Sequence, residues 1–413
     1  MAKPKIRFKG YTNEWEQRKF GEMMNITSVK RIHQSDWTDN GVRFLRARDI
    51  VAASKNEEPD DYLYISEEKY EEYSALSGKV DIDDLLVTGV GTIGVPYLVE
   101  NLEPLYFKDG NIIWFQNKNK IDGKFLYYSF IGNGIQSFIK ASAGTGTVGT
   151  YTIDTGKKTP IQIPSKEEQK KIGEYLTNID NLITLHQRKC DQAKKLKKYM
   201  LQKMFPKNNE SVPEIRFEGF SDDWEQRKVT DLGEIYIGLV TTMTEHYTDK
   251  GHLLIRNSDI KDGYFEFGEN PIYLDEEFSE QNKSRMHKIG DVITVHTGDI
   301  GTSAVIGEYE VNSIGFATIV TRPNQKILDS NYFSTYLNTD THKQWAISMA
   351  TGDGRSNYNL KDYTKLVVPI PHIKEQKKIA ACIVKLNNLI TLHQKKCDQL
   401  KNLKKFMLQN MFV

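Results

Sequence analysis

The chain contains little cysteine and no long apolar run. Its three cysteines do not make a disulfide framework in 413 residues, and none stands at a CxxC or Cys/His spacing that would hold a metal. The longest apolar runs, such as KLVVPIP, are far too short to span a bilayer, and the opening MAKPKIRFKGYTNEW has no signal-peptide core. These absences predict a protein of the reducing cytoplasm, with neither a membrane span nor a bound metal.

The chain also lacks an excess of charge of either sign. It has 56 Lys and Arg residues against 55 Asp and Glu residues. Nucleic-acid-binding proteins usually show a basic surplus, so a role on DNA would require the positive charge to be concentrated on one face. With 38% hydrophobic and 27% charged residues the composition is that of a globular protein, and the length predicts two or more domains.

The most informative feature that is present is an internal repeat. The segment 4–19, PKIRFKGYTNEWEQRK, recurs at 213–228 with 10 of 16 positions identical. The longer segment 164–205 recurs at 371–412 with 26 of 42 positions identical. Between these framing segments the halves agree only in outline, as where RFLRARDI in the first half faces LLIRNSDI in the second. Each half is therefore a divergent globular part followed by a well-preserved long segment.

Both long segments are predicted to be helices of about 40 residues, or about 60 Å at 1.5 Å per residue. Core-compatible residues recur at alternating steps of four and three, forming a heptad seam that only Lys197 and its counterpart Lys404 interrupt. Ser165 and Glu168 stand at capping-box spacing before the first helix, whereas His372 gives the second a weaker cap. Two such helices are expected to pack antiparallel, and a second stripe leaves apolar surface for a partner. This second stripe consists of Leu182, Leu185, Leu196 and Tyr199.

The divergent parts show alternating apolar runs, turns bounded by glycine, and aromatics, which predict mostly β-structure with short helices. Surface helices are expected at 66–75, 124–143 and 331–350. The predicted fold is α+β, with two mixed α/β domains separated by two long antiparallel helices in a pseudo-twofold repeat. The predicted boundaries are a first domain at 1–163, a central helix at 164–205, a linker at 206–212, a second domain at 213–370 and a C-terminal helix at 371–413.

One glycine motif resembles a dinucleotide-binding site. GVGTIG at 89–94 fits the GxGxxG pattern, yet the VPYLVE that follows predicts a strand rather than the required helix. In the second half of the repeat His296 replaces Gly89. A tight turn between two strands is therefore the predicted structure.

A second motif resembles a metal-dependent nuclease. Asp60, Glu67 and Lys69 follow the order of a PD…ExK site, but their spacing is short, and Phe278 stands in place of Lys69 in the second half. A charged surface helix is the favoured interpretation, with a self-contained nuclease as the alternative function. No P-loop, amino-methyltransferase NPPY, HExxH or GxSxG motif is present, so no catalytic residue is predicted.

Polar residues in repeat-equivalent loops are the candidates for reading DNA, because Arg commonly pairs with guanine and Asn with adenine in the major groove. The alternative for any one of them is a solvated loop side chain. The candidates of the first half are Lys30, Arg31, Arg46, Arg48, Thr92, Thr145, Thr147 and Tyr151. The candidates of the second half are Thr241, Thr242, Arg256, Asn257, His296, Thr297, Asp299, Arg355, Ser356, Asn357 and Tyr358.

The layout of variable domain, preserved helix, second variable domain and second preserved helix resembles the DNA-specificity subunits of type I restriction–modification enzymes. The signatures that carry the resemblance are IRFKGYTNEWEQRK, RFLRARDI, the G-x-I-G turns and LITLHQRKCDQ with LKKYMLQKMF, each with its copy. The resemblance covers essentially the whole chain. The tandem layout is specific, while each short motif alone is weak.

The resemblance implies two target recognition domains, each reading one half of a split double-stranded DNA target, with the helices acting as a ruler. It also implies that two methyltransferase subunits dock on the pseudo-twofold frame and bring S-adenosylmethionine, and that translocating restriction subunits join them. Two near-equal frames in one chain suit two copies of one partner. The chain itself is expected to bind no cofactor and to catalyse no reaction. A coiled-coil adaptor with no role on nucleic acid is the remaining alternative.

Overall fold

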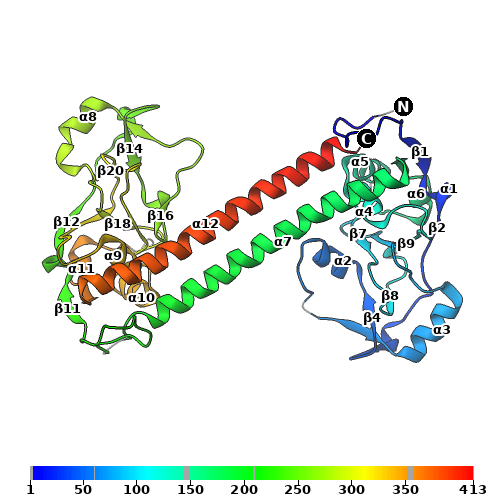
Figure 1. Cartoon of the computed structure of the whole chain (residues 1–413), viewed down its shortest axis with the longest axis horizontal. Coiled ribbons are helices and arrows are strands. Elements are labelled where there is room, and N and C mark those ends of the chain that lie inside the picture. Colours follow the sequence, from blue (N-terminus) through cyan, green and yellow to red (C-terminus); the bar gives the residue numbers. More distant parts are fainter. Residues whose placement is uncertain (1–2, 60, 144–148, 208–209, 351–356, 413) are drawn as a thin grey trace. The chain divides into compact units, whose positions relative to one another are not determined.

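A computed structural model describes residues 3–59, 61–143, 149–207, 210–350 and 357–412. The chain divides into two compact units, each of which combines one globular part with portions of both long helices. Unit 1 consists of residues 1–186 and 396–413, and unit 2 of residues 187–395. Figure 1 labels many of the elements of both units.

Unit 1 contains three small sheets. Its framing strands β1 (Glu16–Lys19) and β10 (Pro160–Ile163) pair antiparallel. An antiparallel sheet has the order β2 (Asn25–Thr27), β9 (Ile112–Gln116), β6 (Leu85–Thr88) and β7 (Pro96–Leu98). A third sheet has the order β3 (Trp37–Thr38), β5 (Leu63–Ile65), β4 (Val42–Leu45) and β8 (Leu105–Phe107), in which β4 and β8 run parallel.

The short helices of unit 1 are α1 (Phe20–Met23), α2 (Ala47–Ser54), α3 (Glu67–Ser77), α4 (Gly123–Ile131), α5 (Asn133–Ser142) and α6 (Ile153–Lys158). The helix predicted at 66–75 is confirmed as α3, which begins where Ser66 Oγ accepts a hydrogen bond from Lys69 N at 3.2 Å. The surface helix predicted at 124–143 is wrong in two respects. The chain turns at Gly132, between α4 and α5, and α4 is largely buried because apolar side chains occur all round it.

Unit 2 repeats the same sheets with one addition. The framing strands are β11 (Glu225–Lys228) and β22 (Val367–Ile370). One four-stranded sheet has the order β12 (Gly233–Ile237), β21 (Ile319–Pro323), β18 (Val292–Thr294) and β19 (Ser303–Val305). The other has the order β13 (Tyr247–Thr248), β17 (Tyr273–Leu274), β14 (His252–Ile255) and β20 (Ile314–Gly315). The addition is a hairpin of β15 (Ile260–Lys261) and β16 (Tyr264–Phe265), where unit 1 has α2.

The short helices of unit 2 are α8 (Glu276–Gln281), α9 (Ser330–Leu337), α10 (Asp340–Met349) and α11 (Leu360–Tyr363). The surface helix predicted at 331–350 is likewise divided, into α9 and α10. Every residue of α9 except Asn331 is buried. Both units therefore carry a buried helix at the equivalent position, α4 and α9. The sequence pattern did not distinguish this buried helix from a surface helix.

Two helices of 38 residues each, α7 (Lys166–Lys203) and α12 (Ile373–Asn410), run antiparallel (Figure 1). In unit 1, Cys397 Sγ lies 3.6 Å from the carbonyl oxygen of Ile183. In unit 2, Cys190 Sγ lies 3.8 Å from the carbonyl oxygen of Ile390. The thiols are thus seam residues, as the heptad pattern predicted, and the mixed α+β fold with two long antiparallel helices is confirmed.

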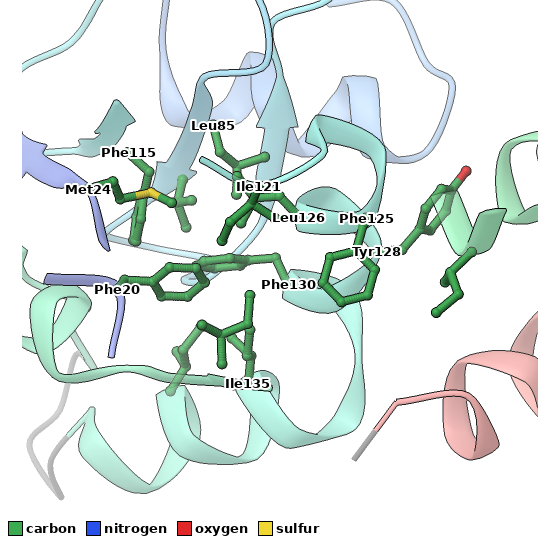
Figure 2. Close-up of a cluster of buried hydrophobic side chains, with 14 of the residues drawn as sticks. Phe20, Met24, Leu85, Phe115, Ile121, Phe125, Leu126, Tyr128, Phe130 and Ile135 are labelled. Atoms are coloured by element: carbon green, nitrogen blue, oxygen red, sulfur yellow. The ribbon is translucent and has the colours of Figure 1, made fainter. Parts of the chain in front are cut away.

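The core of unit 1 gathers apolar side chains from its strands, from α4 and from both long helices. Figure 2 shows part of it, including Phe20, Phe115 and Phe130. The ring of Phe20 contacts those of Phe115 and Phe130 at centroid distances of 5.3 and 5.8 Å. Phe412, which follows α12, contacts Trp15 with centroids 6.4 Å apart. In unit 2, Phe205 plays the part of Phe412. Among the residues that the structure describes, no helix is both long and apolar enough to cross a membrane.

Candidate nucleic-acid interface

In unit 1 the loop 108–111 brings the predicted DNA-reading loops together. Its Lys108 N donates to Leu45 O at 2.8 Å, directly before Arg46, and its Asn111 O accepts from Gly89 N at 2.7 Å. The side chain of Asp109 accepts a hydrogen bond from Arg31 Nε at 2.8 Å. Three segments that are far apart in the sequence therefore meet at one edge of the sheets, where β4, β6 and β8 end.

Unit 2 builds the same meeting point around residues 315–317. Phe316 N donates to Ile255 O at 2.8 Å, directly before Arg256, which repeats the Lys108 contact of unit 1. Ala317 N donates to Leu239 O at 2.8 Å and so holds the segment that leads to Thr241 and Thr242. Apart from turn residues, no sequence pattern marks the segments 108–111 and 315–317 as contact points, because these contacts join strands that are distant in the chain.

One backbone hydrogen bond fixes the glycine turn in the same way in both units. Tyr151 N donates to Gly89 O, and Tyr358 N donates to His296 O, each at 2.9 Å. The turn itself joins two antiparallel strands, β6 to β7 and β18 to β19. Gly91, at φ +70°, adopts a backbone conformation that favours glycine. The predicted tight turn is confirmed, and the dinucleotide motif has neither the helix nor the parallel strand that it would need.

The basic candidates of unit 1 differ in how firmly they are held. Arg46 is mostly buried, and its guanidinium donates to both carboxylate oxygens of Asp49, at 3.0 and 2.9 Å, and to Asp61. Arg48 is 59% exposed and pairs with Asp61. Lys30 is exposed, with its ammonium 4.5 Å from the ring centre of Tyr73. Lys30, Arg31 and Arg48 therefore present exposed positive charge, while Arg46 stiffens the turn that carries Arg48.

Unit 2 has the equivalent ion pair between Arg256 and Asp259, with nitrogen–oxygen distances of 3.0 and 2.8 Å. The side chain of Asn257 is also committed within the unit. Its Nδ2 lies 3.2 Å from Ala317 O, and its Oδ1 accepts from His296 N at 2.7 Å. In both units, side-chain contacts therefore hold the turn that follows β4 or β14, next to the segment 108–111 or 315–317.

A compact polar cluster in unit 2 has no counterpart among the described residues of unit 1. Thr297 Oγ1 donates to Asn357 Oδ1 at 2.7 Å, and His296 Nδ1 lies 2.8 Å from the same hydroxyl. Burial lowers the pKa of His296, while a hydrogen bond with Asn359 acts in the opposite direction. The imidazole is therefore neutral at neutral pH and offers hydrogen-bonding atoms rather than a charge. In unit 1, Gly89 and Val90 occupy the positions of His296 and Thr297.

Four further candidates are exposed. Thr92 in unit 1 and Asp299 in unit 2 occupy equivalent positions in the glycine turns, and Thr241 and Thr242 follow the segment held by Ala317. Asp299 accepts a hydrogen bond from Thr302 Oγ1 at 2.6 Å, and its side chain is 74% exposed. A carboxylate in this place can accept a hydrogen bond from the amino group of cytosine.

The structure places two candidates in the core instead. Tyr151 and Tyr358 are 2% and 0% exposed, and the Tyr151 hydroxyl bonds to Thr159 Oγ1 at 2.7 Å. Burial raises the pKa of both phenols. These rings anchor the glycine turns from inside and are not available at the surface. Four other candidates, Thr145, Thr147, Arg355 and Ser356, lie outside the described residues.

The nuclease-like motif does not assemble a metal site in the part of the chain that the structure describes. Glu67 and Lys69 lie in the first turn of α3, where Lys69 Nζ pairs with Glu72 at 3.2 Å. Asp60 lies outside the described residues. Across the described ranges, no group of three or more His, Cys, Asp or Glu side chains could hold a metal ion. The charged helix that was the favoured interpretation of this segment is what α3 forms.

The geometry is that of a protein with two related recognition surfaces. The family model described as the type I restriction modification DNA specificity domain matches the chain twice, over residues 12–195 and 221–402. Because these matches cover most of the chain, the chain belongs to that family. The resemblance inferred from the repeat is confirmed, and the chain carries two DNA-specificity domains in tandem.

Individual relatives span most of the chain. The type I restriction enzyme MjaVIII specificity subunit of Methanocaldococcus jannaschii is 25% identical over 304 residues, covering 70% of this chain and 69% of the relative. The EcoBI specificity subunit of Escherichia coli is 21% identical over 394 residues, covering 91% and 79%. The crystal structure of the S subunit from M. genitalium shares the fold, with a TM-score of 0.64, 15% identity, and coverage of 100% and 99%.

Proposed function

We propose that this chain reads a bipartite double-stranded DNA target, one half with each unit. The observation that carries the proposal is the meeting of equivalent loops at the same sheet edge in both units. Sequence is read by side chains that reach base edges from such exposed loops. A framework repeated with different side chains is the arrangement that two different half-sites require.

The two surfaces differ in chemistry. Unit 1 presents Lys30, Arg31 and Arg48, which are cationic and exposed. Unit 2 presents neutral donors and acceptors, chiefly the hydroxyl of Thr297 and the amide of Asn357. Because Arg suits the acceptor edge of guanine and Asn the mixed edge of adenine, the half-site of unit 1 is expected to be richer in guanine contacts.

A domain exchange tests this proposal. Residues 20–160 are replaced by the corresponding part of another specificity subunit, and the methylated sequence in the host genome is mapped. We expect one half of the target to change while the other half is retained. A change in both halves, or in neither, would contradict the assignment of one half-site to each unit.

We further propose that the chain is a scaffold without chemistry of its own, to which two methyltransferase subunits bind. Those subunits would bring S-adenosylmethionine, and restriction subunits would join the complex. The helix pair supports this because apolar side chains remain exposed at equivalent positions of both helices. Leu182 and Leu185 on α7 are 43% and 45% exposed, and their counterparts Leu389 and Leu392 on α12 are 36% and 50% exposed. Such surface suits a partner interface.

The scaffold proposal is tested by placing one charge on each equivalent stripe. Leu185→Glu and Leu392→Glu together should abolish co-purification of the methyltransferase subunit, and each alone should leave a complex with one copy. Lys198→Gln and Lys405→Gln, at equivalent exposed positions on the opposite flank of the seam, lower the charge by the same amount and are the matched controls. Native mass spectrometry counts the copies. Full assembly of the double Leu variant would contradict the proposed docking surface.

A further inference from the structure

The edge of unit 2 at which residues 239–242 meet residues 315–317, called here the recognition edge, carries the exposed apolar side chains of Val240 and Phe316. Val240 is 69% exposed and Phe316 is 40% exposed. Leu239, which directly precedes Val240, forms an isolated parallel bridge with Phe316. The two exposed side chains therefore belong to adjacent stretches of backbone, within one unit and on one surface.

These two stretches of backbone lie in close contact because Gly238 has no side chain. A Cβ atom on Gly238 would lie 2.3 Å from the carbonyl oxygen of Gly315, a distance that no larger residue could accommodate. Leu239 N also donates a hydrogen bond to Gly315 O at 2.8 Å. The segment that carries Val240 is thus held against the segment that carries Phe316.

The backbone at Phe316 is fixed by hydrogen bonds on both of its sides. Its N–H donates to Ile255 O at 2.8 Å. Asn257 Nδ2 donates to Phe316 O at 3.3 Å and to Ala317 O at 3.2 Å. Ala317 has φ +47°, in the left-handed region that alanine rarely adopts. One exposed apolar side chain is ordinary on a protein surface, but an aromatic ring held by a strained, hydrogen-bonded turn points to a function.

Unit 1 carries charged groups at the equivalent place. Lys108 makes the backbone contact that Phe316 makes in unit 2, since its N–H donates to the last residue of β4. The next residue, Asp109, accepts a hydrogen bond from Arg31 Nε at 2.8 Å. The two units thus share the backbone contact and differ in the chemistry that they present beside it, charged in unit 1 and apolar in unit 2.

We propose that Phe316 and Val240 contact the methyl group of a thymine in the half-site that unit 2 reads. The inference rests on the proposed function and adds a specificity-determining contact to it. In the major groove only thymine presents an apolar group, its 5-methyl, and apolar side chains that include phenylalanine contact this group. The apolar recognition edge of unit 2 matches that feature, whereas the charged groups of unit 1 do not.

Insertion between base pairs is the other use of an exposed phenylalanine on DNA, and it kinks the duplex. Contact from within the groove is favoured because Phe316 is only 40% exposed, so more than half of this residue is covered by unit 2 itself. A side chain that separates two stacked base pairs has to project further from its own surface.

The test uses the complex purified from its host through a tag on this chain, and a duplex that carries the mapped target. In the test duplex, deoxyuridine replaces thymine in the half-site that the domain exchange leaves unchanged, which removes only 5-methyl groups. Fluorescence anisotropy measures the affinity. The wild-type complex should bind the test duplex about threefold to fivefold more weakly than the target, the effect of one buried methyl group. A control duplex with deoxyuridine only outside the two half-sites should bind as tightly as the target.

Three variants assign the methyl effect to the recognition edge. Phe316→Ala should bind the target more weakly and should no longer distinguish the target from the test duplex. Phe316→Leu keeps an apolar side chain and should retain the distinction. Ile289→Ala is the matched control, because Ile289 is 63% exposed and precedes β18, whereas the glycine turn follows that strand. This control should behave as wild type.

Equal affinity of the wild-type complex for the target and the test duplex would overturn the inference, as would a half-site of unit 2 that contains no A·T pair. A methyl effect that persists in Phe316→Ala would overturn it as well. Loss of a protein subunit from the Phe316→Ala complex would instead assign the side chain to a protein interface. If the wild-type complex does not prefer the target over a scrambled duplex, the proposed function itself fails.

Discussion

Arg7 donates two hydrogen bonds to the buried carboxylate of Glu168, from Nε at 2.6 Å and from Nη2 at 2.7 Å. Arg216 makes the same bidentate pair with Glu375, at 2.8 and 3.0 Å. Each pair ties a preserved framing segment to the first turn of a long helix. The framing segments are therefore preserved because they lock each helix to its own domain.

Breaking the first of these pairs should destabilise unit 1. Glu168→Gln leaves the mostly buried guanidinium of Arg7 without its carboxylate, and we expect a loss of about 3 kcal/mol in the free energy of unfolding. Urea denaturation followed by tryptophan fluorescence measures it. Glu167→Gln, one residue away and exposed, should cost under about 1 kcal/mol. Equal losses for the two variants would show that the ion pair contributes nothing specific.

Acid should destabilise unit 2 through two buried histidines. Burial lowers the pKa of His342 to about 4 and that of His287 to about 3, the latter with a smaller contribution from Arg322. The unfolded chain binds these protons near pH 6.5, so stability falls as the pH drops below about 6.5 and stops falling near the folded pKa values. At pH 5 each histidine should cost about 2 kcal/mol relative to pH 7.5.

The measurement for this pH effect compares wild type with His342→Ile, which has the side chain that unit 1 carries at the equivalent position, Ile135. The variant should lose about 2 kcal/mol less stability between pH 7.5 and pH 5. Hydrogen exchange resolves the change to unit 2. An identical pH dependence in both proteins would show that His342 is not the titrating group.

The polar cluster of unit 2 should determine part of one half-site. Asn357→Ala removes the partner of Thr297 and one candidate base contact, and we expect discrimination at one base pair to weaken by about 1–3 kcal/mol. Methylome sequencing should show relaxed specificity confined to the half-site of unit 2. Ser348→Ala, at an exposed site on α10, is the control. Relaxation in the other half-site would place the cluster elsewhere on the DNA.

Substitutions of Arg46 and of Arg48, two of the three arginines of RFLRARDI, should differ in their effects. Arg46→Ala and Asp49→Asn remove the same ion pair, so both should lower the stability of unit 1 to a similar extent. Arg48→Ala should leave stability within about 0.5 kcal/mol, because the side chain is largely exposed, and should weaken target binding. Thermal unfolding and anisotropy together distinguish them. If Arg46 instead contacted a base, Arg46→Ala would lose target specificity while Asp49→Asn would keep it.

The sequence was sufficient for the two long helices and for the grouping of the loops, but not for the buried helices α4 and α9. The heptad pattern placed Cys190 and Cys397 in the seam, and repeat equivalence identified loops that do converge. The pattern failed where a side chain is fixed by a distant partner. Tyr151 stands among glycines and threonines, which suggests exposure, yet its backbone N–H donates to Gly89 O and its ring lies in the core. The sequence alone suggests that Arg46 is free to contact DNA. In the structure its side chain pairs instead with the carboxylate of Asp49, three residues later.

The capping of the long helices shows the same limit. Ser165 Oγ accepts from Glu168 N at 3.3 Å, as predicted, and the weaker cap of the second helix is formed by His372 Nδ1, 3.2 Å from Lys374 N. The carboxylate of Glu168 does not complete the capping box but binds Arg7. The local spacing predicted the Ser165 cap. Only the tertiary structure shows that the carboxylate of Glu168 binds Arg7.

The placement of Phe412 against Trp15 has a consequence for biosynthesis. The ribosome makes Trp15 almost 400 residues before it makes Phe412, so the domain that emerges first waits longest for its last core side chains. Unit 2 lies wholly within residues 187–395 and can close earlier. Folding order along the nascent chain is thereby reversed. A mutation near the carboxyl end should therefore destabilise the amino-terminal domain before the second domain.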